Sequence, residues 1–210
     1  TIPKNLPLLI KQRAEEYPDI KLQAYKNQDG KFEYSSYSRF YNEVICFAAA
    51  LSKLGVKKGS NVALISDNRR EWLITDLAIQ SLGGAAVPRG CDSMGNEIRF
   101  IIDFADCEFA FFENLRQLEK VLEKANETPK LKTAILFDRP DAEPADCPFQ
   151  ILYFDDLLTE GKNIYRENSF NCQAEIENTM RSIEGDDIAT IIFTSGTTGT
   201  PKGVMLTHNN

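Results

Sequence analysis

The stretch Thr194-Ser195-Gly196-Thr197-Thr198-Gly199-Thr200-Pro201-Lys202-Gly203 decides how the rest of the chain is interpreted. Apart from Pro201 and Lys202, every residue in it is glycine, serine or threonine. Apolar runs at 188–193 and 204–206 flank it, and both predict buried strands that hold a loop at the edge of a sheet. Backbone N–H groups, hydroxyls and one ammonium within a short arc are typical of a loop that binds polyphosphate.

The spacing of the glycines and the lysine excludes two common phosphate-binding motifs. A Walker loop requires Gly-Lys-Ser/Thr at the start of a helix, whereas Lys202 lies between Pro201 and Gly203 and a strand is expected next. A dinucleotide-binding fingerprint requires a further glycine and a following helix. The stretch therefore belongs to neither class.

The order of residues in this stretch resembles the signature of the adenylate-forming enzymes, which include acyl-CoA synthetases, peptide-synthetase adenylation domains and luciferases. That signature is an aromatic residue, then T-S-G-T-T-G-x-P-K-G-V, then T-H-x-N. The chain supplies Phe193, residues 194–204, and Thr207-His208-x-Asn210. The resemblance implies that the phosphates of ATP are bound by Thr194, Ser195, Gly196, Thr197, Thr198, Gly199 and Lys202.

The resemblance also implies an activity and its cofactors. The chain is similar to the N-terminal part of a long-chain fatty acid–CoA ligase, which uses ATP and Mg²⁺ to convert a carboxylate to an acyl adenylate plus pyrophosphate and then acylates CoA. The substrates implied are a fatty acid, ATP and CoA. The catalytic residues are expected downstream of Asn210, so we expect the chain to be truncated and inactive alone. No metal ligand is predicted.

Two other functions stay open at this point. The chain could belong to another adenylate former, such as a peptide-synthetase adenylation domain, or to a non-catalytic nucleotide-binding or interaction module. Segments upstream of the loop favour the long-chain synthetases, because 55–59, 66–68 and 82–88 resemble them. Residues 89–92, Arg-Gly-Cys-Asp, depart from the family pattern, which has an aliphatic residue and a polar turn after the proline.

The amino-acid composition of the chain limits the kinds of molecule that it is expected to bind. The chain has 31 acidic and 24 basic residues, a net charge of −7 and no basic stripe interleaved with aromatics, which argues against nucleic-acid binding. Five cysteines without a C-x-x-C pair and a single histidine do not suggest a zinc site of the usual kind. The odd number of cysteines and their positions fit a reducing, cytoplasmic setting. No signal peptide or transmembrane run is expected. Peripheral contact with a membrane and the oligomeric state are left open.

The chain before the loop predicts an α/β fold with a mostly parallel, helix-covered sheet, the N-terminal part of the adenylate-forming synthetase fold. We expect residues 1–185 to form a first subdomain and 186–210 a strand–loop–strand unit that opens the next part. Polar segments at 138–149 and 166–173 are expected on the surface. Helices are predicted at 6–17, 37–54, 72–80, 98–105 and 115–122, and strands at 22–25, 32–34, 62–65, 85–87, 109–112, 134–137, 151–154, 188–193 and 204–206.

Ser195 and His208 invite a comparison with serine hydrolases. A nucleophile elbow needs glycine two residues before the serine, and Phe193 occupies that position. No aspartate is placed by local sequence logic to orient His208. We therefore interpret His208 as part of the loop motif's framework.

Overall fold

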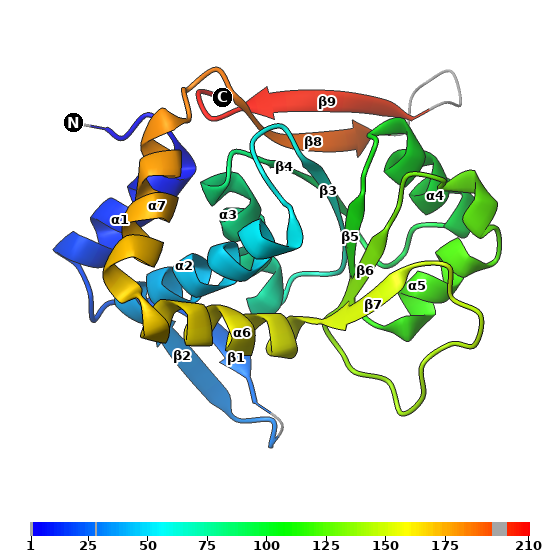
Figure 1. The fold of residues 1–210 in the computed structure, drawn as a ribbon, viewed down its shortest axis with the longest axis horizontal. Helices are drawn as coiled ribbons and strands as arrows, with labels where there is room; N and C mark the ends of the chain where they lie inside the picture. The colour runs from blue at the N-terminus through cyan, green and yellow to red at the C-terminus, as the bar shows by residue number, and fades with distance from the viewer. Residues whose placement is uncertain (1, 28, 195–200) are drawn as a thin grey trace.

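A seven-stranded sheet with the order β7-β6-β5-β3-β4-β8-β9 forms the centre of the computed structural model, which describes residues 2–27, 29–194 and 201–210 (Figure 1). Its strands are β3 (Asn61–Ile65), β4 (Ala85–Arg89), β5 (Phe109–Phe112), β6 (Thr133–Leu136), β7 (Gln150–Tyr153), β8 (Ile188–Thr194) and β9 (Lys202–Thr207). A separate antiparallel hairpin consists of β1 (Lys21–Lys26) and β2 (Phe32–Ser36). The helices are α1 (Leu6–Glu16), α2 (Tyr37–Leu54), α3 (Arg70–Ser81), α4 (Gly95–Phe104), α5 (Leu115–Leu122), α6 (Phe154–Glu167) and α7 (Ser169–Ser182), with a 3₁₀ turn at Ala125–Glu127.

All neighbouring strands from β7 to β8 pair in parallel, and the last strand, β9, pairs with β8 in the antiparallel direction. This arrangement confirms the predicted fold class, a mostly parallel sheet covered by helices. β8 and β9 extend the same sheet as β3 to β7. The division of the chain at residue 185 stays a prediction.

Alternating side chains of the central strands pack into two cores, one on each face of the sheet. Leu64 of β3 and Phe111 of β5 lie with the apolar sides of α2, α3 and α6. Their neighbours Ile65 and Phe112 lie on the other face with α4 and α5. Both faces of these strands are therefore buried, as the continuous apolar runs in the sequence predict.

The order of the strands creates a topological switch point at β3. From β3 the chain passes through α3, in the first core, to the neighbour β4, whereas from the other neighbour, β5, it passes through α5, in the second core, to β6. The loops after β3 and β5 therefore diverge to opposite faces of the sheet. In open α/β sheets the crevice at such a point, outside the carboxyl ends of the strands, is where ligands bind.

The helix α2 has the boundaries that its sequence predicts. The Ser36 side chain accepts a hydrogen bond from the amide of Arg39, and Gly55 adopts a positive φ of 113° at the other end. α2 packs closely against α6, because Gly161 of α6 lies over the carbonyl oxygen of Cys46 and a Cβ at that position would overlap it. The close approach explains why a glycine is tolerated inside α6.

The structure differs from the expectations in four places. Residue 154 begins α6 and does not end a strand, and α6 and α7 were not predicted, although 166–171 in the polar segment at their junction are exposed as expected. The apolar positions of these helices are sparse, so the periodicity is weak, although Cys172, Ile176 and Met180 recur at every fourth position. β4 also continues through Pro88. A proline lacks the backbone N–H that strand pairing uses, but the bridge between β4 and β8 is at Ala86, before the proline, so that donor is not needed.

The fourth error concerns the strand after the loop. The sequence predicts a buried strand at 204–206, but Val204 and Met205 of β9 are exposed. β9 is the last strand of the sheet and has β8 as its partner. Thr194 and Lys202, which flank the predicted loop, belong to this β8–β9 pair at the edge of the sheet, and residues 195–200 lie outside the described residues.

Among residues 2–27, 29–194 and 201–210, no helix is both long enough and apolar enough to cross a membrane.

Candidate nucleotide-binding site

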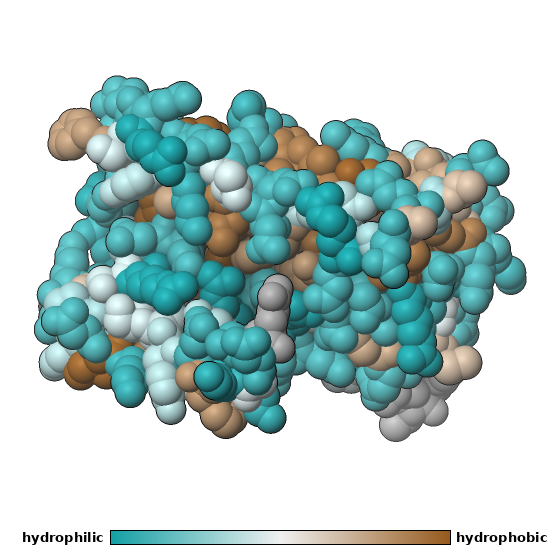
Figure 2. Space-filling model, turned by 90° about the horizontal axis from the view of Figure 1, so that it is seen from below, coloured by the Kyte–Doolittle hydropathy of each residue, from teal (hydrophilic) through white to brown (hydrophobic). Residues whose placement is uncertain are grey.

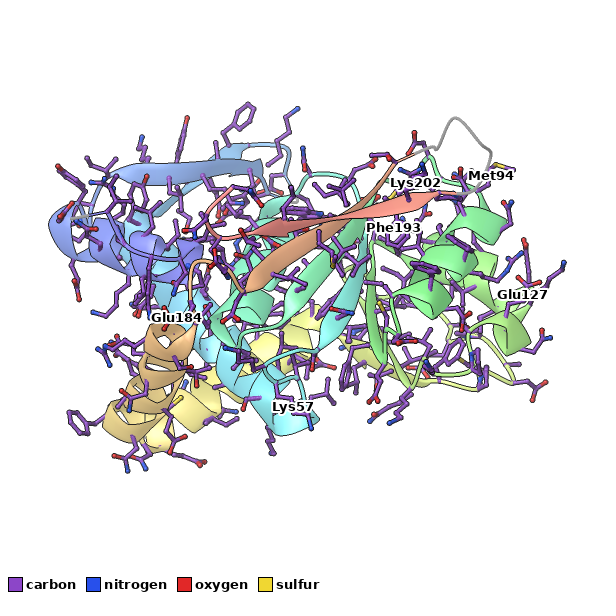
Figure 3. All side chains as sticks on the ribbon, turned by 90° about the horizontal axis from the view of Figure 1, so that it is seen from above. Lys57, Met94, Glu127, Glu184, Phe193 and Lys202 are labelled. Carbon is purple, nitrogen blue, oxygen red and sulfur yellow. The ribbon has the colours of Figure 1, made fainter. Side chains whose placement is uncertain are left out.

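Thr194 and Lys202 face each other at the mouth of the connection between β8 and β9. Thr194 is the last residue of β8 and Lys202 the first of β9, and the two are partners in the antiparallel register. Both side chains are exposed. Figure 3 shows Lys202 at the end of the β8–β9 ribbon, close to Phe193 and to the start of α4. A hydroxyl and an ammonium therefore flank the mouth of the predicted phosphate loop.

Five other predicted site residues lie outside the described residues. They are Ser195, Gly196, Thr197, Thr198 and Gly199. Their proposed contacts with phosphate stay predictions. The structure brings together the two ends of the loop motif, Thr194 and Lys202, at the carboxyl edge of the parallel strands.

A hollow of about 460 Å³ lies beside this mouth, at the switch point of the sheet. It is lined by Ser66, Asp67, Asn68, Trp72, Pro88, Arg89, Gly90, Ile192 and Phe193. These residues come from the loop after β3, the first turn of α3, the end of β4 and the end of β8. The hollow thus combines the preferred ligand position of an open α/β sheet with the strand that leads into the loop.

Arg89 fixes the end of β8 at this hollow. Its Nη1 donates a hydrogen bond to the carbonyl oxygen of Phe193 at 3.2 Å, and its Nη2 lies 3.6 Å from a carboxylate oxygen of Glu97 in α4. One guanidinium therefore joins β4, α4 and the residue next to Thr194. A cation at this position also adds positive potential beside a site expected to receive phosphate.

The ring of Phe193 anchors the same strand in the core. It makes edge-to-face contacts with Phe100 and Phe104 of α4, with ring centroids 6.3 Å and 6.0 Å apart. Gly203 lies opposite Phe193, and a Cβ there would come within 3.1 Å of the phenyl ring and 3.2 Å of Ile191. The glycine after Lys202 therefore leaves room for the aromatic residue before Thr194.

Asp67, Cys91 and Glu113 form a cluster next to the hollow, one from each loop after β3, β4 and β5. Their ligand atoms lie within 4.8 Å of one another, a set that could hold a metal ion. Glu113 accepts hydrogen bonds from the Ser66 hydroxyl at 3.1 Å and the Asp67 amide at 3.0 Å, and Asp67 accepts one from the Cys91 amide at 3.0 Å. Burial and the two carboxylates raise the pKa of the Cys91 thiol to about 11. The cluster therefore holds a neutral thiol and joins three loops.

Trp72 belongs to both the core and the hollow. The sequence favours core packing for it, and the half-buried indole does pack against the core below α3. It also lines the hollow beside the phosphate loop. Its ring is thus available to a ligand on one side.

His208 lies at the far end of β9 from Lys202. Six residues of extended chain span roughly 20 Å, so His208 is distant from Thr194 and from the start of the loop. Its Nδ1 accepts a hydrogen bond from the Leu6 amide at 3.4 Å, and its own amide donates to the carbonyl oxygen of Asp187. Burial lowers the pKa of its imidazole. This geometry supports a framework role and opposes pairing with a serine at the loop.

Sequence reasoning did not identify Asp67, Arg89 or Glu113 as site residues. They belong to three separate segments that parallel pairing brings to one edge. One signal pointed to Arg89, because residues 89–92 depart from the pattern of the family that the loop resembles. The departure falls at the end of β4.

Comparison with known proteins identifies relatives along the whole chain. It is 27% identical over 214 residues to a long-chain-fatty-acid–CoA ligase of Xenopus laevis, covering 99% of this chain and 27% of that protein. It is 34% identical over 188 residues to fatty acyl-CoA synthetase B of Dictyostelium discoideum, covering 86% and 26%. A long-chain-fatty-acid–acyl-carrier-protein ligase of Arabidopsis thaliana, described as chloroplastic, is 28% identical, with 99% and 28% covered. The chain thus spans little more than a quarter of the length of these relatives.

Solved structures share the fold. A fatty acyl-CoA synthetase of Mycobacterium tuberculosis superposes with a TM-score of 0.68 at 21% identity, over 98% of this chain and 35% of that one. An anthranilate CoA ligase in complex with anthranoyl-AMP gives 0.73 at 19% identity, over 99% and 36%. The model of the AMP-binding enzyme family matches residues 10–210. The chain therefore belongs to the AMP-binding enzyme family.

Proposed function

We propose that this chain contributes the phosphate-binding part of a ligase that activates a long-chain fatty acid with ATP. The observation that carries the proposal is the pairing of Thr194 with Lys202 at the mouth of the loop, beside a hollow at the switch point of the sheet. Membership of the AMP-binding enzymes and similarity to fatty acid ligases support it.

The chemistry proposed has two steps. A carboxylate oxygen of the fatty acid attacks the α-phosphorus of ATP and pyrophosphate leaves. The sulfur of the acceptor thiol then attacks the acyl carbon and AMP leaves, while the thiol proton is lost. Positioned donors accelerate such a phosphoryl transfer by stabilising the charge that develops on the departing phosphates.

The roles of this chain's own residues follow from the loop. Residues 194–199 would donate hydroxyl and amide hydrogens to the β- and γ-phosphates, and Lys202 would approach the same oxygens from the facing strand. Arg89 would hold the base of the loop through Phe193. Mg²⁺ would screen phosphate charge, and the oxygens of Thr194 and Asp67 are donors of the kind that it accepts.

The thiol acceptor is proposed to be CoA, as in the names of the Xenopus and Dictyostelium relatives. The Arabidopsis relative is named for an acyl-carrier-protein acceptor, which makes the phosphopantetheine thiol of such a protein the second candidate. A cytoplasmic location is proposed from the five free cysteines.

The test compares Lys202→Ala with Lys57→Ala, a matched exposed lysine near the amino edge of the sheet (Figure 3). A charge-assisted hydrogen bond to phosphate contributes about 1.5–3 kcal/mol, so Lys202→Ala should weaken the binding of magnesium pyrophosphate roughly ten- to a hundredfold. Isothermal titration calorimetry on this chain measures both affinities, and Lys57→Ala should match the wild type.

Exchange of labelled pyrophosphate into ATP by the intact enzyme in the presence of a fatty acid tests the chemical step. Lys202→Ala should slow the exchange and Lys57→Ala should not. Equal exchange rates in the two variants would overturn the assignment. Both side chains are exposed, so equal thermal unfolding midpoints are expected and would show that folding is intact.

A further inference from the structure

The β1–β2 hairpin has an outer face that combines aromatic rings with lysines. The hairpin projects from the body of the molecule at the lower left of Figure 1. Cross-strand partners Ala24–Tyr34 and Lys26–Phe32 define this face, and Lys21 lies over the Tyr34 ring. All five residues are exposed. We call this set, Lys21, Ala24, Lys26, Phe32 and Tyr34, the outer face.

The aromatic rings of the outer face are exposed to an unusual degree. Phe32 is 63% and Tyr34 48% exposed, and Tyr17 and Ile20, just before β1, are exposed as well. Figure 2 views the side on which the hairpin projects and shows hydrophobic residues among hydrophilic ones there. Single exposed apolar residues are ordinary, but two large rings exposed on the same face of one strand mark a candidate interaction surface.

The two lysines of the outer face lie over aromatic rings and not beside carboxylates. Lys21 Nζ lies 4.0 Å from the centroid of the Tyr34 ring, and Lys26 Nζ lies 5.5 Å from that of Phe32. Neither these two nor Lys31 in the turn forms an ion pair with any residue that the structure describes. Glu33 points to the opposite face, where it accepts a hydrogen bond from the Tyr25 hydroxyl.

The inner face holds the hairpin on the body. Ser35 is fully buried, and the Gln23 amide donates to the carbonyl oxygen of Arg70 at 3.4 Å. The guanidinium of Arg70 lies 5.3 Å from the centroid of the Tyr25 ring and is ion-paired with Glu43 at 2.6 Å. These contacts present the outer face in one orientation, so binding would require little ordering.

We propose that the outer face binds the surface of an anionic lipid bilayer. Aromatic rings with one apolar side prefer the headgroup region, and lysines close to the surface are attracted by anionic headgroups. The hairpin would supply both, while the remainder of an acidic chain of net charge −7 stays away from the membrane. This role is independent of nucleotide binding.

Charge and geometry favour a bilayer over two other occupants. A second copy of the outer face would bring lysines against lysines, which repel. Single-stranded nucleic acid needs free ring faces for base stacking, and ammonium groups already lie over Tyr34 and Phe32.

The experiment is co-sedimentation of the chain, without nucleotide, with vesicles of phosphatidylcholine alone or of equal parts phosphatidylcholine and phosphatidylserine. The wild type should sediment with the anionic vesicles, less with the neutral ones, and less as salt is added. F32S combined with Y34S should weaken binding about tenfold or more, because two apolar contacts are lost. K21Q combined with K26Q should weaken binding to the anionic vesicles roughly ten- to thirtyfold.

Matched controls separate this surface from general effects. F170S removes an exposed ring from α7, and K57Q combined with K162Q removes two exposed lysines elsewhere. Both controls should sediment like the wild type. All the altered side chains are exposed, so equal unfolding midpoints are expected and checked by circular dichroism.

Three results would overturn the proposal. The first is no binding of the wild type to either vesicle, and the second is equal binding by the hairpin variants and the controls. The third is a different occupant: binding of a labelled oligothymidine in fluorescence anisotropy, or a dimer in light scattering, that is lost in the hairpin variants while vesicle binding is absent. Loss of pyrophosphate binding in Lys202→Ala has no bearing on any of these outcomes.

Discussion

The strands β3 and β9 have similar sequences and opposite environments. Val62-Ala63-Leu64-Ile65 in β3 and Val204-Met205-Leu206 in β9 are both short continuous apolar runs. Every residue of the first run is 0% exposed, whereas Val204 is 45% and Met205 62% exposed. A continuous apolar run therefore indicates a strand but not its burial.

The difference comes from the neighbours of each strand. β3 lies between β4 and β5, with helices over both faces. β9 is the last strand, and its partner β8 alternates buried residues with exposed ones such as Ile192. Burial is thus set by position in the sheet. Three changes, described from the largest expected effect to the smallest, test this comparison.

Leu64→Ala in β3 should produce the largest loss of stability. The side chain is fully buried between the sheet and α3, so its truncation removes contacts and leaves a cavity. We expect the free energy of unfolding to fall by about 2–5 kcal/mol. Urea denaturation followed by circular dichroism measures it. A loss below about 1 kcal/mol would show that β3 is not the close-packed centre of the sheet.

Asp76→Asn tests how strongly burial in α3, the helix above β3, disfavours the charged form of the Asp76 carboxyl group. Burial raises the pKa of the Asp76 carboxyl to about 6, although Gln80 donates a hydrogen bond to it at 2.9 Å. Because the folded pKa lies above the unfolded value of 3.8, the native state binds more protons between about pH 4 and pH 6. The contribution of Asp76 to stability therefore falls as the pH rises through this window.

Asp76→Asn should accordingly be more stable than the wild type at pH 7, by about 1–3 kcal/mol, and the difference should shrink toward pH 4. Unfolding free energies of both proteins across this range measure the difference. Other carboxyl groups, such as Asp187, have lowered pKa values and titrate in both proteins, so they cancel in the comparison. A pH-independent difference would contradict the raised pKa.

Met205→Ala in β9 should have the smallest effect. The side chain is mostly exposed, and substitutions at such positions change the free energy of unfolding by about 0.5 kcal/mol or less. The same urea titration as for Leu64→Ala measures it. A loss comparable to that of Leu64→Ala would mean that β9 is covered in solution, and the contrast between the two strands would not hold.

Local sequence signals predicted most of the elements correctly. Ser35 or Ser36 as the cap and Gly55 as the end predicted α2, of which Ser36 is the cap, and apolar runs predicted β3, β5 and β6. α6 and α7 were missed because their buried positions are few and α6 contains Gly161, whose small size matters only when α2 is packed against it. Secondary-structure propensity and the spacing of apolar residues describe one helix or strand at a time, so they do not detect a contact between two helices.

The candidate site also has one part that local sequence predicted and another that depends on contacts between distant segments. The phosphate loop was recognisable because its residues are adjacent, and the structure places its two ends, Thr194 and Lys202, in register. Asp67, Cys91 and Glu113 come from distant segments and meet only when β3, β4 and β5 are paired. No local pattern contains that information.

The sequence by itself determined the fold class, the family and the presence, between two strands, of a loop motif that predicts phosphate binding. These follow from short-range properties: the chemistry of adjacent residues and the period of apolar positions. The tertiary structure decided which apolar strand is buried, how Arg89 anchors the end of β8, and that the lysines and rings of the hairpin share one exposed face. Each of these depends on contacts between segments far apart in the chain, because burial and electrostatic environment belong to the packed assembly and not to any single segment.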